Sequence, residues 1–173
     1  MKVVYTSIVA TIVCMNTTTL VPDQPAGARL QGCTNFKLRQ LTRRITQHYD
    51  AELARVGLRT TQYSLLSHVL KLGPVQPGAL AQAMKMEAST LTRNLEPLVA
   101  AGWVETASGA DGRSRLIRIT DDGRAKRLDA QRHWKAAQTS LNRVLGMPRL
   151  LTLHTLIDEA LDLLAPATGA GDE

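Results

Sequence analysis

The chain has 173 residues, of which 44% are hydrophobic, 21% are charged and only 3% are aromatic, and its formal net charge at pH 7 is +6. This composition predicts a globular protein rather than a disordered one, and the scarcity of aromatic rings argues against a single-strand nucleic-acid binder, which relies on stacking. The excess of lysine and arginine is compatible with duplex nucleic acid as a partner.

The N-terminal segment combines two kinds of signal. It starts with MKVVYTSIVATIVC, a lysine followed by a short apolar stretch as in a signal peptide, but no small-residue cleavage site follows. We expect translation to begin at Met15, with a signal peptide as the alternative. Residues 1–32, which are rich in proline and glycine toward their end, are predicted to form an arm.

The length of the apolar runs and the number of cysteines predict the cellular compartment. No apolar run approaches the ~20 residues of a membrane-spanning helix, so no membrane partner is expected. Two cysteines, Cys14 and Cys33, are too few for a disulfide framework. Both observations favour a cytoplasmic protein.

The first predicted helix is capped by Thr34 and runs to about Val56, where Gly57 ends it. Apolar residues recur along it at a spacing of three to four, which makes one apolar stripe. The second helix, QYSLLSHVLKL, is capped by Thr60 or Thr61 and ended by a Gly-Pro pair.

A helix-turn-helix is predicted next. The segment PVQ suits one short strand, proline opens the third helix, PGALAQAM, and the turn KMEA leads to a fourth helix from Ala88 to about Ala101. Leu91, Leu95 and Leu98 cluster on one face of that helix. We expect Pro97 to kink it or to reorient its last turns, because proline removes a backbone hydrogen bond.

The opposite face of the fourth helix carries polar groups. They are Ser89, Thr90, Arg93 and Glu96, with Thr92 on the flank. Hydroxyl and main-chain N–H groups at a helix start hold phosphates, and arginine can fork onto guanine. This face therefore suits a duplex groove, although an ordinary solvated face has the same composition.

Two β-prone segments, WVET and LIRIT, predict a hairpin whose tip is SGADGRSR. Arg113 and Arg115 are two residues apart and project to the same side of an extended strand. Asp111 is placed to hold the guanidinium of Arg113. An arginine at the end of a thin hairpin can enter a minor groove.

Two C-terminal helices are predicted. Thr120, followed by two acids, starts a helix that continues to Gly146, and Pro148 opens a second that ends near Ala165. Eight leucine or isoleucine residues cover more of this last helix than a single neighbour needs. We expect them to pack against a second copy in a homodimer, with a helix sandwiched inside its own subunit as the alternative.

This order of elements resembles the multiple antibiotic resistance regulator (MarR) family of winged helix-turn-helix repressors. The resemblance covers about Thr34 to Ala165 and rests most on STLTRNLEPLVAAGWV, DGRSRLIRITDDGRA and LRTTQYSLLSHVLKLGP. It implies a mainly α fold with a small β wing and a dimer joined through the first and last helices. The implied regions are the arm at 1–32, a first dimerisation helix at 33–58, the winged helix-turn-helix DNA-binding region at 59–120, C-terminal dimerisation helices at 121–166 and a flexible tail at 167–173.

The resemblance also implies how the side chains meet a pseudo-palindromic duplex. The residues facing the major groove would be Ser89, Thr90, Thr92 and Arg93. The minor-groove residue would be Arg113, oriented by Asp111, with Arg115 nearby. The family's wing carries a further acid earlier in its tip, where this chain has Ser108 or Gly109, a departure that bears on the rigidity of the wing.

Family members respond to a small aromatic or phenolic effector, or to oxidation. Candidate pocket residues are His48, Tyr49, Tyr63 and Ser67, with the alternative that they are ordinary core or surface residues. Cys33 precedes a helix start, which stabilises a thiolate. In the hydroperoxide-sensing branch, however, the cysteine would stand at Asn35, two residues later.

The sequence gives little support to an enzyme. The four histidines have no metal-ligand spacing, and the chain lacks CxxC, a Gly-rich phosphate loop and a GxSxG elbow. We therefore expect no cofactor and no metal. Between Lys85 and Arg127 the chain has eight basic and six acidic residues, so the basic excess is not concentrated in the winged segment. A sequence-independent architectural DNA binder and a protein-interaction winged helix therefore remain as alternatives.

Overall fold

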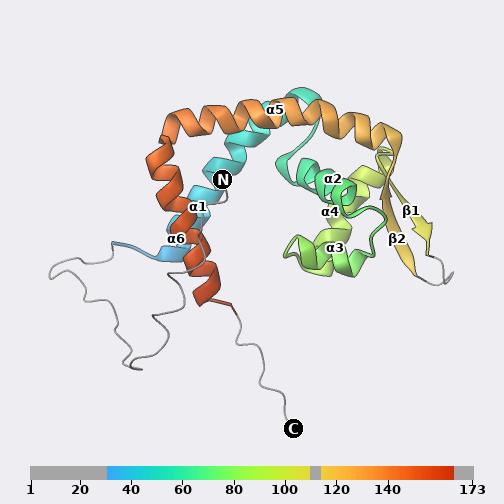
Figure 1. Ribbon diagram of the computed structural model, residues 1–173, viewed down its shortest axis with the longest axis horizontal. Coiled ribbons are helices and arrows are strands. Elements are labelled where there is room, and N and C mark those ends of the chain that lie inside the picture. The colour runs from blue at the N-terminus through green and yellow to red at the C-terminus, as the bar shows by residue number, and fades with distance from the viewer. Residues whose placement is uncertain (1–30, 110–113, 166–173) are drawn as a thin grey trace, which may run out of the picture. The chain divides into compact units, whose positions relative to one another are not determined.

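The computed structural model describes residues 31–109 and 114–165 (Figure 1). The chain divides into two units, Met1–Lys37 and Leu38–Glu173. The predicted start site, nearly all of the arm, the tail at 167–173, and the wing-tip residues Asp111 and Arg113 lie outside the described residues.

The described elements follow the predicted order, and the expectation of a mainly α fold with a small β wing is confirmed. They are α1 (Thr34–Leu53), the 3₁₀ helix η2 (Ala54–Val56), α2 (Thr60–Leu72), α3 (Pro77–Ala83), α4 (Ala88–Ala100), β1 (Val104–Ser108), β2 (Arg115–Ile119), α5 (Asp121–Leu145) and α6 (Met147–Leu163).

The start of α2 differs from its prediction. The N-cap residue is Arg59, whose backbone N–H donates to the Gln62 side chain at 2.8 Å. Thr60 is the first helical residue, and its hydroxyl donates instead to Asp50 of α1 at 2.6 Å. The hydroxyl ties two helices together rather than capping one, because a carboxylate from the preceding helix lies within reach.

The wing is a two-stranded antiparallel sheet, in register from Val104 opposite Ile119 to Ser108 opposite Arg115. The predicted strand PVQ is reduced to one residue, Val75, which exchanges both backbone hydrogen bonds with Ile117 at 3.0 and 2.8 Å. This bridge ties the α2–α3 connection to the wing.

One hydrophobic core holds the helix-turn-helix and the wing together. It includes Leu65 and Leu66 of α2, Leu91 of α4 and Ile117 of β2, which are all at most 4% exposed. Each such side chain contributes roughly 1.5–3 kcal/mol through burial. The predicted inward face of α4 is confirmed, since all three of its leucines are buried.

The junction between the wing and α5 is unusually close. Thr120 caps α5 as predicted, accepting from the Gly123 N–H at 3.0 Å, and its own N–H donates to the Trp103 carbonyl at 3.1 Å. A Cβ built on Gly123 would lie 2.0 Å from that carbonyl oxygen. Only glycine therefore fits at position 123, in the first turn of α5.

The last helix, α6, leaves most of its apolar residues exposed within the described chain. Leu150 is buried, whereas Leu151, Leu156 and Leu161 are 62%, 58% and 65% exposed. The described part of the subunit therefore does not sandwich this helix. In the described ranges, no helix is long and apolar enough to cross a membrane.

Replacing Gly123 with alanine is expected to destabilise the protein by about 1–3 kcal/mol, because backbone must move to admit the new methyl group. The matched control is Gly78→Ala in α3, where a Cβ meets nothing within 4 Å and better helix propensity stabilises by about 0.5–1 kcal/mol. Urea unfolding followed by circular dichroism measures both. Equal stability of the Gly123→Ala variant and the wild type would contradict the close contact.

Candidate nucleic-acid interface

The outer face of α4 presents the polar side chains that the sequence predicted. Ser89, Thr90 and Arg93 are exposed, and the backbone at Glu87, the N-cap, is extended without a side-chain cap hydrogen bond. The first N–H groups of α4 are therefore not satisfied by a cap. Together they form a surface that can donate hydrogen bonds to an anionic backbone.

The turn between α3 and α4 depends on one residue with a left-handed backbone conformation. Lys85 has a positive φ of 52°, and the Met86 N–H donates back to the Ala81 carbonyl at 2.9 Å. This left-handed residue ends α3 and reverses the chain. It allows α3 and α4 to form the helix-turn-helix in which α4 is the outer helix.

Pro97 does not end α4, which continues to Ala100. The helix resumes normal bonding beyond it, since the Ala101 N–H donates to the Pro97 carbonyl at 3.1 Å. Pro97 is exposed, so water can bond the Arg93 carbonyl that lacks a partner N–H. This exposure explains how proline is tolerated so late in the helix.

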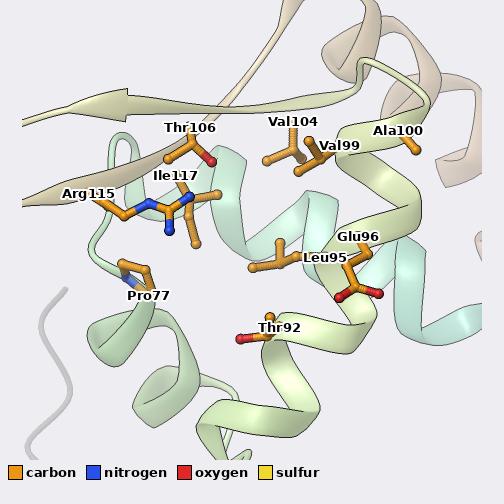
Figure 2. A pocket seen from close by; sticks show the side chains of 10 residues that line it. All are labelled: Pro77, Thr92, Leu95, Glu96, Val99, Ala100, Val104, Thr106, Arg115 and Ile117. Carbon is orange, nitrogen blue, oxygen red and sulfur yellow. The ribbon is translucent and has the colours of Figure 1, made fainter.

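A hollow of about 420 Å³ separates α4 from the wing (Figure 2). Its inner wall is apolar and is formed by Leu95, Val99, Ala100, Val104 and Ile117, with Pro77 at the start of α3. Its polar groups are Thr92 and Glu96 from α4 and Thr106 and Arg115 from the wing. Figure 2 shows Arg115 and Glu96 on opposite sides of this hollow.

The predicted α4 residues therefore divide into two groups. Thr92 lines the hollow, and its hydroxyl donates to the Ala88 carbonyl at 3.0 Å. Ser89, Thr90 and Arg93 are not among the lining residues. The flank position predicted for Thr92 thus faces the wing, which periodicity alone does not reveal because it carries no information on where the wing lies.

The two described arginines of the wing differ in their surroundings. Arg118 on β2 is paired across the sheet with Glu105, at 2.7 Å between the guanidinium and the carboxylate. Arg115 is exposed and lies beside the hollow. The predicted minor-groove residue Arg113 and its partner Asp111 lie outside the described residues, so their roles stay predictions.

Two of the candidate effector residues join α1 to α5. The His48 Nε2 lies 3.1 Å from the Ala137 carbonyl oxygen, and the Tyr49 hydroxyl donates to the Gln138 side chain. Burial raises the pKa of Tyr49 above its usual value. Both side chains therefore have intramolecular partners at the helix junction.

The other two candidates lie on α2. The Tyr63 ring stacks on Trp134 with centroids 6.0 Å apart, and the Ser67 hydroxyl accepts from the Arg127 Nε at 3.3 Å. Ser67 lines a hollow between α2 and α5, but His48, Tyr49 and Tyr63 do not belong to the lining of that hollow. The role of the four residues as an effector pocket stays a prediction.

The redox candidate Cys33 is an exposed free cysteine. Its carbonyl accepts the Lys37 N–H at 3.1 Å, which places it immediately before the first turn of α1. A sensing role stays a prediction. Among residues 31–109 and 114–165, no group of three or more His, Cys, Asp or Glu side chains could hold a metal ion.

Comparison with known proteins identifies relatives of this arrangement. A model of the MarR family matches residues 56–114. The chain is 29% identical to the uncharacterized HTH-type transcriptional regulator YwoH of Bacillus subtilis over 90 residues, which are 52% of this chain and 66% of YwoH. It is 26% identical to the multiple antibiotic resistance protein MarR of Salmonella typhimurium over 130 residues, 73% of this chain and 87% of that protein.

A solved structure is also similar. The transcriptional regulator MosR of M. tuberculosis, crystallised in complex with DNA, has 30% sequence identity to this chain and a TM-score of 0.66. The match covers 78% of this chain and all of that one (100%). The similarity therefore extends well beyond the helix-turn-helix.

The raised pKa of Tyr49 has a consequence at high pH. The phenol contributes its full stability below about pH 10, where the unfolded residue is also protonated, and this contribution is lost as pH rises through the higher folded pKa. The free energy of unfolding of the wild type should therefore fall more steeply above pH 10 than that of Tyr49→Phe. Urea denaturation at a series of alkaline pH values tests this, and parallel curves would contradict it.

Proposed function

This chain belongs to the MarR family of winged helix-turn-helix transcriptional regulators, and from that premise we propose that it is a cytoplasmic, dimeric regulator that binds duplex DNA sequence-specifically. It acts as a repressor that a small ligand or thiol oxidation releases. The observation that carries the proposal is the exposed hydroxyl and arginine face of α4, fixed by three buried leucines beside a basic wing.

In this function the two sides of the interface have different tasks. Ser89 and Thr90 would position the protein on phosphates, which carry no sequence information. Arg93 lies one turn further along α4 and would read a base edge in the major groove. The wing arginines, Arg113 and Arg115, would meet the adjacent minor groove.

Dimerisation is proposed from the exposed apolar residues of α6. Four leucines of α6, Leu151, Leu156, Leu161 and Leu163, are 58–85% exposed, which is more apolar surface than one helix of a monomer usually leaves in water. Two-fold symmetry would place two α4 helices in successive major grooves, about 34 Å apart, on a pseudo-palindromic site. MosR, which shares 30% identity, was crystallised with DNA, and this supports a DNA partner.

Sequence-specific DNA binding is tested by fluorescence anisotropy on duplexes that tile the region upstream of the gene for this protein. A scrambled duplex is the control for non-specific binding. Arg93→Ala should weaken binding to the best tile by about 1–3 kcal/mol and reduce its preference over the scramble. Arg113→Ala should weaken binding by a similar free energy, mostly on duplexes with A·T-rich flanks. Arg132→Ala on α5, an exposed arginine paired with Asp129, is the matched control and should bind as the wild type does.

Equal binding of the wild type to every tile and to the scramble would favour the architectural alternative, and no binding would favour a protein-interaction surface. Wild-type affinity in both Arg93→Ala and Arg113→Ala would show that these side chains do not contact the bases.

The dimer is tested by placing a charge on α6. Leu161→Glu should convert the dimer to monomer, because a carboxylate cannot be buried without a partner in an apolar interface. Leu128→Glu on α5 is the matched control, since the two leucines are 65% and 64% exposed in the single chain. Sedimentation velocity gives the oligomeric state, and a dimer that survives Leu161→Glu would place the interface elsewhere.

A further inference from the structure

One face of α1 carries positive charges that no acidic side chain offsets. Arg39 and Arg43 are exposed and four residues apart, so they lie on the same side of the helix, and we call them the basic face of α1. Arg44 adds a third exposed arginine beside them. Among the described residues, no ion pair includes any of the three. Like charges at this spacing destabilise an isolated helix.

The last turns of α6 carry the opposite charge. Asp158 and Asp162 are exposed and again four residues apart, and we call them the acidic face of α6, with Glu159 beside them. The ion pairs of the described residues include none of these carboxylates. Asp162 lies in the last turn, where the helix dipole disfavours a negative charge. The preferences of the isolated helix therefore do not explain this pattern.

Each charged face also includes an exposed apolar side chain. On α6, Leu151 is 62% exposed and lies seven residues before Asp158, a spacing that puts both side chains on one side of the helix. On α1, Leu38 is 51% exposed. A surface depression of about 310 Å³ lies on α1, and its lining residues are Leu38, Arg39, Thr42 and Arg43. Both faces thus combine apolar area with charge.

The two faces are complementary in charge, yet no ion pair joins them within the described part of one chain. A second copy of the chain offers each face the partner that it lacks. The acidic face is also continuous with the exposed leucines of α6, from which the dimer is proposed. In a two-fold symmetric dimer, every contact between α1 of one subunit and α6 of the other occurs twice.

We propose that the basic face of α1 binds the acidic face of α6 in a second copy of this chain, and that this charge pattern selects the partner. The inference rests on the proposed dimer and adds to it which chains can pair. Exposed ion pairs stabilise little individually. A related chain with other charges at these positions would, however, leave like charges facing one another, which disfavours a mixed dimer.

The test reverses each face separately in the full chain. Arg39→Glu combined with Arg43→Glu gives a chain in which both faces are acidic. Asp158→Lys combined with Asp162→Lys gives a chain in which both are basic. Each variant should have a dimer dissociation constant about a hundredfold or more above that of the wild type, because like charges meet at both symmetric contacts. Sedimentation velocity over a range of concentrations measures this constant.

An equimolar mixture of the two variants is the decisive sample. In a mixed dimer each acidic face meets a basic one, so mixed dimers should form with nearly the affinity of the wild type. Native mass spectrometry identifies them by mass. Recovery in the mixture also excludes misfolding as the cause of the loss, since a chain that cannot fold gains nothing from a complementary charge.

The matched control is Lys71→Glu combined with Lys85→Glu, two exposed lysines outside α1 and α6. It changes the net charge as much as the reversal on α1 does and should dimerise as the wild type does. The wild type gives a further measurement that needs no substitution. Raising NaCl from about 0.05 to about 0.5 M should weaken its dimer about tenfold, because salt screens exposed charges. A dimer whose stability does not fall with salt would overturn the pairing.

Reversed variants that dimerise as the wild type does, or a mixture that forms no mixed dimer, would overturn the pairing and leave the dimer itself intact. Unchanged dimerisation with a loss of DNA affinity in the α1 variant would also overturn it and assign the basic face to duplex DNA. A monomeric wild type would overturn the proposed dimer together with the pairing. Loss of sequence-specific DNA binding would overturn the regulatory function without affecting the sedimentation result.

Discussion

The close approach of α5 to the Trp103 carbonyl is the constraint on which the rest of the structure depends. Thr120 donates its backbone N–H to that carbonyl and its hydroxyl to the Gly102 carbonyl at 2.7 Å, while Gly123 leaves room for both. Lys126 lies over the Trp103 ring, 5.0 Å from its centre. The end of α4, the base of the wing and the start of α5 are thereby joined at one point.

The helix α5 contacts both the winged region and α1. The first turns of α5 are fixed to the wing and place Arg127 against α2, whereas its middle contacts α1 through Tyr49 and His48. One helix is therefore bonded both to the winged region and to α1, and its i to i−4 hydrogen bonds make it stiff between those two places. The helix α5 has no described break before Gly146, so one continuous helix runs from the base of the wing to the start of α6.

Local signals predicted most of the fold, because they depend on a few neighbouring residues. The cap at Thr120, the end of the first helical segment at Gly57 and the inward leucines of α4 required no knowledge of the tertiary structure. The predicted cap at Thr60 or Thr61 was wrong: Arg59 is the N-cap, and the Thr60 hydroxyl donates to Asp50, ten residues earlier. Gly123 shows the same limit, since a helical glycine after a good cap hints at a packing reason but does not identify the Trp103 carbonyl.

The candidate site was predictable only where it is a helix face. Both hollows form between elements, so their existence depends on packing angles that no periodicity reports. Charge has a similar limit, because net charge does not separate arginines with a partner from those without one. Arg118 is paired with Glu105, whereas Arg93 and Arg115 have no ion pair among the described residues. Net charge therefore does not report how many exposed arginines are free of a carboxylate partner, and it is those arginines that determine the local positive potential.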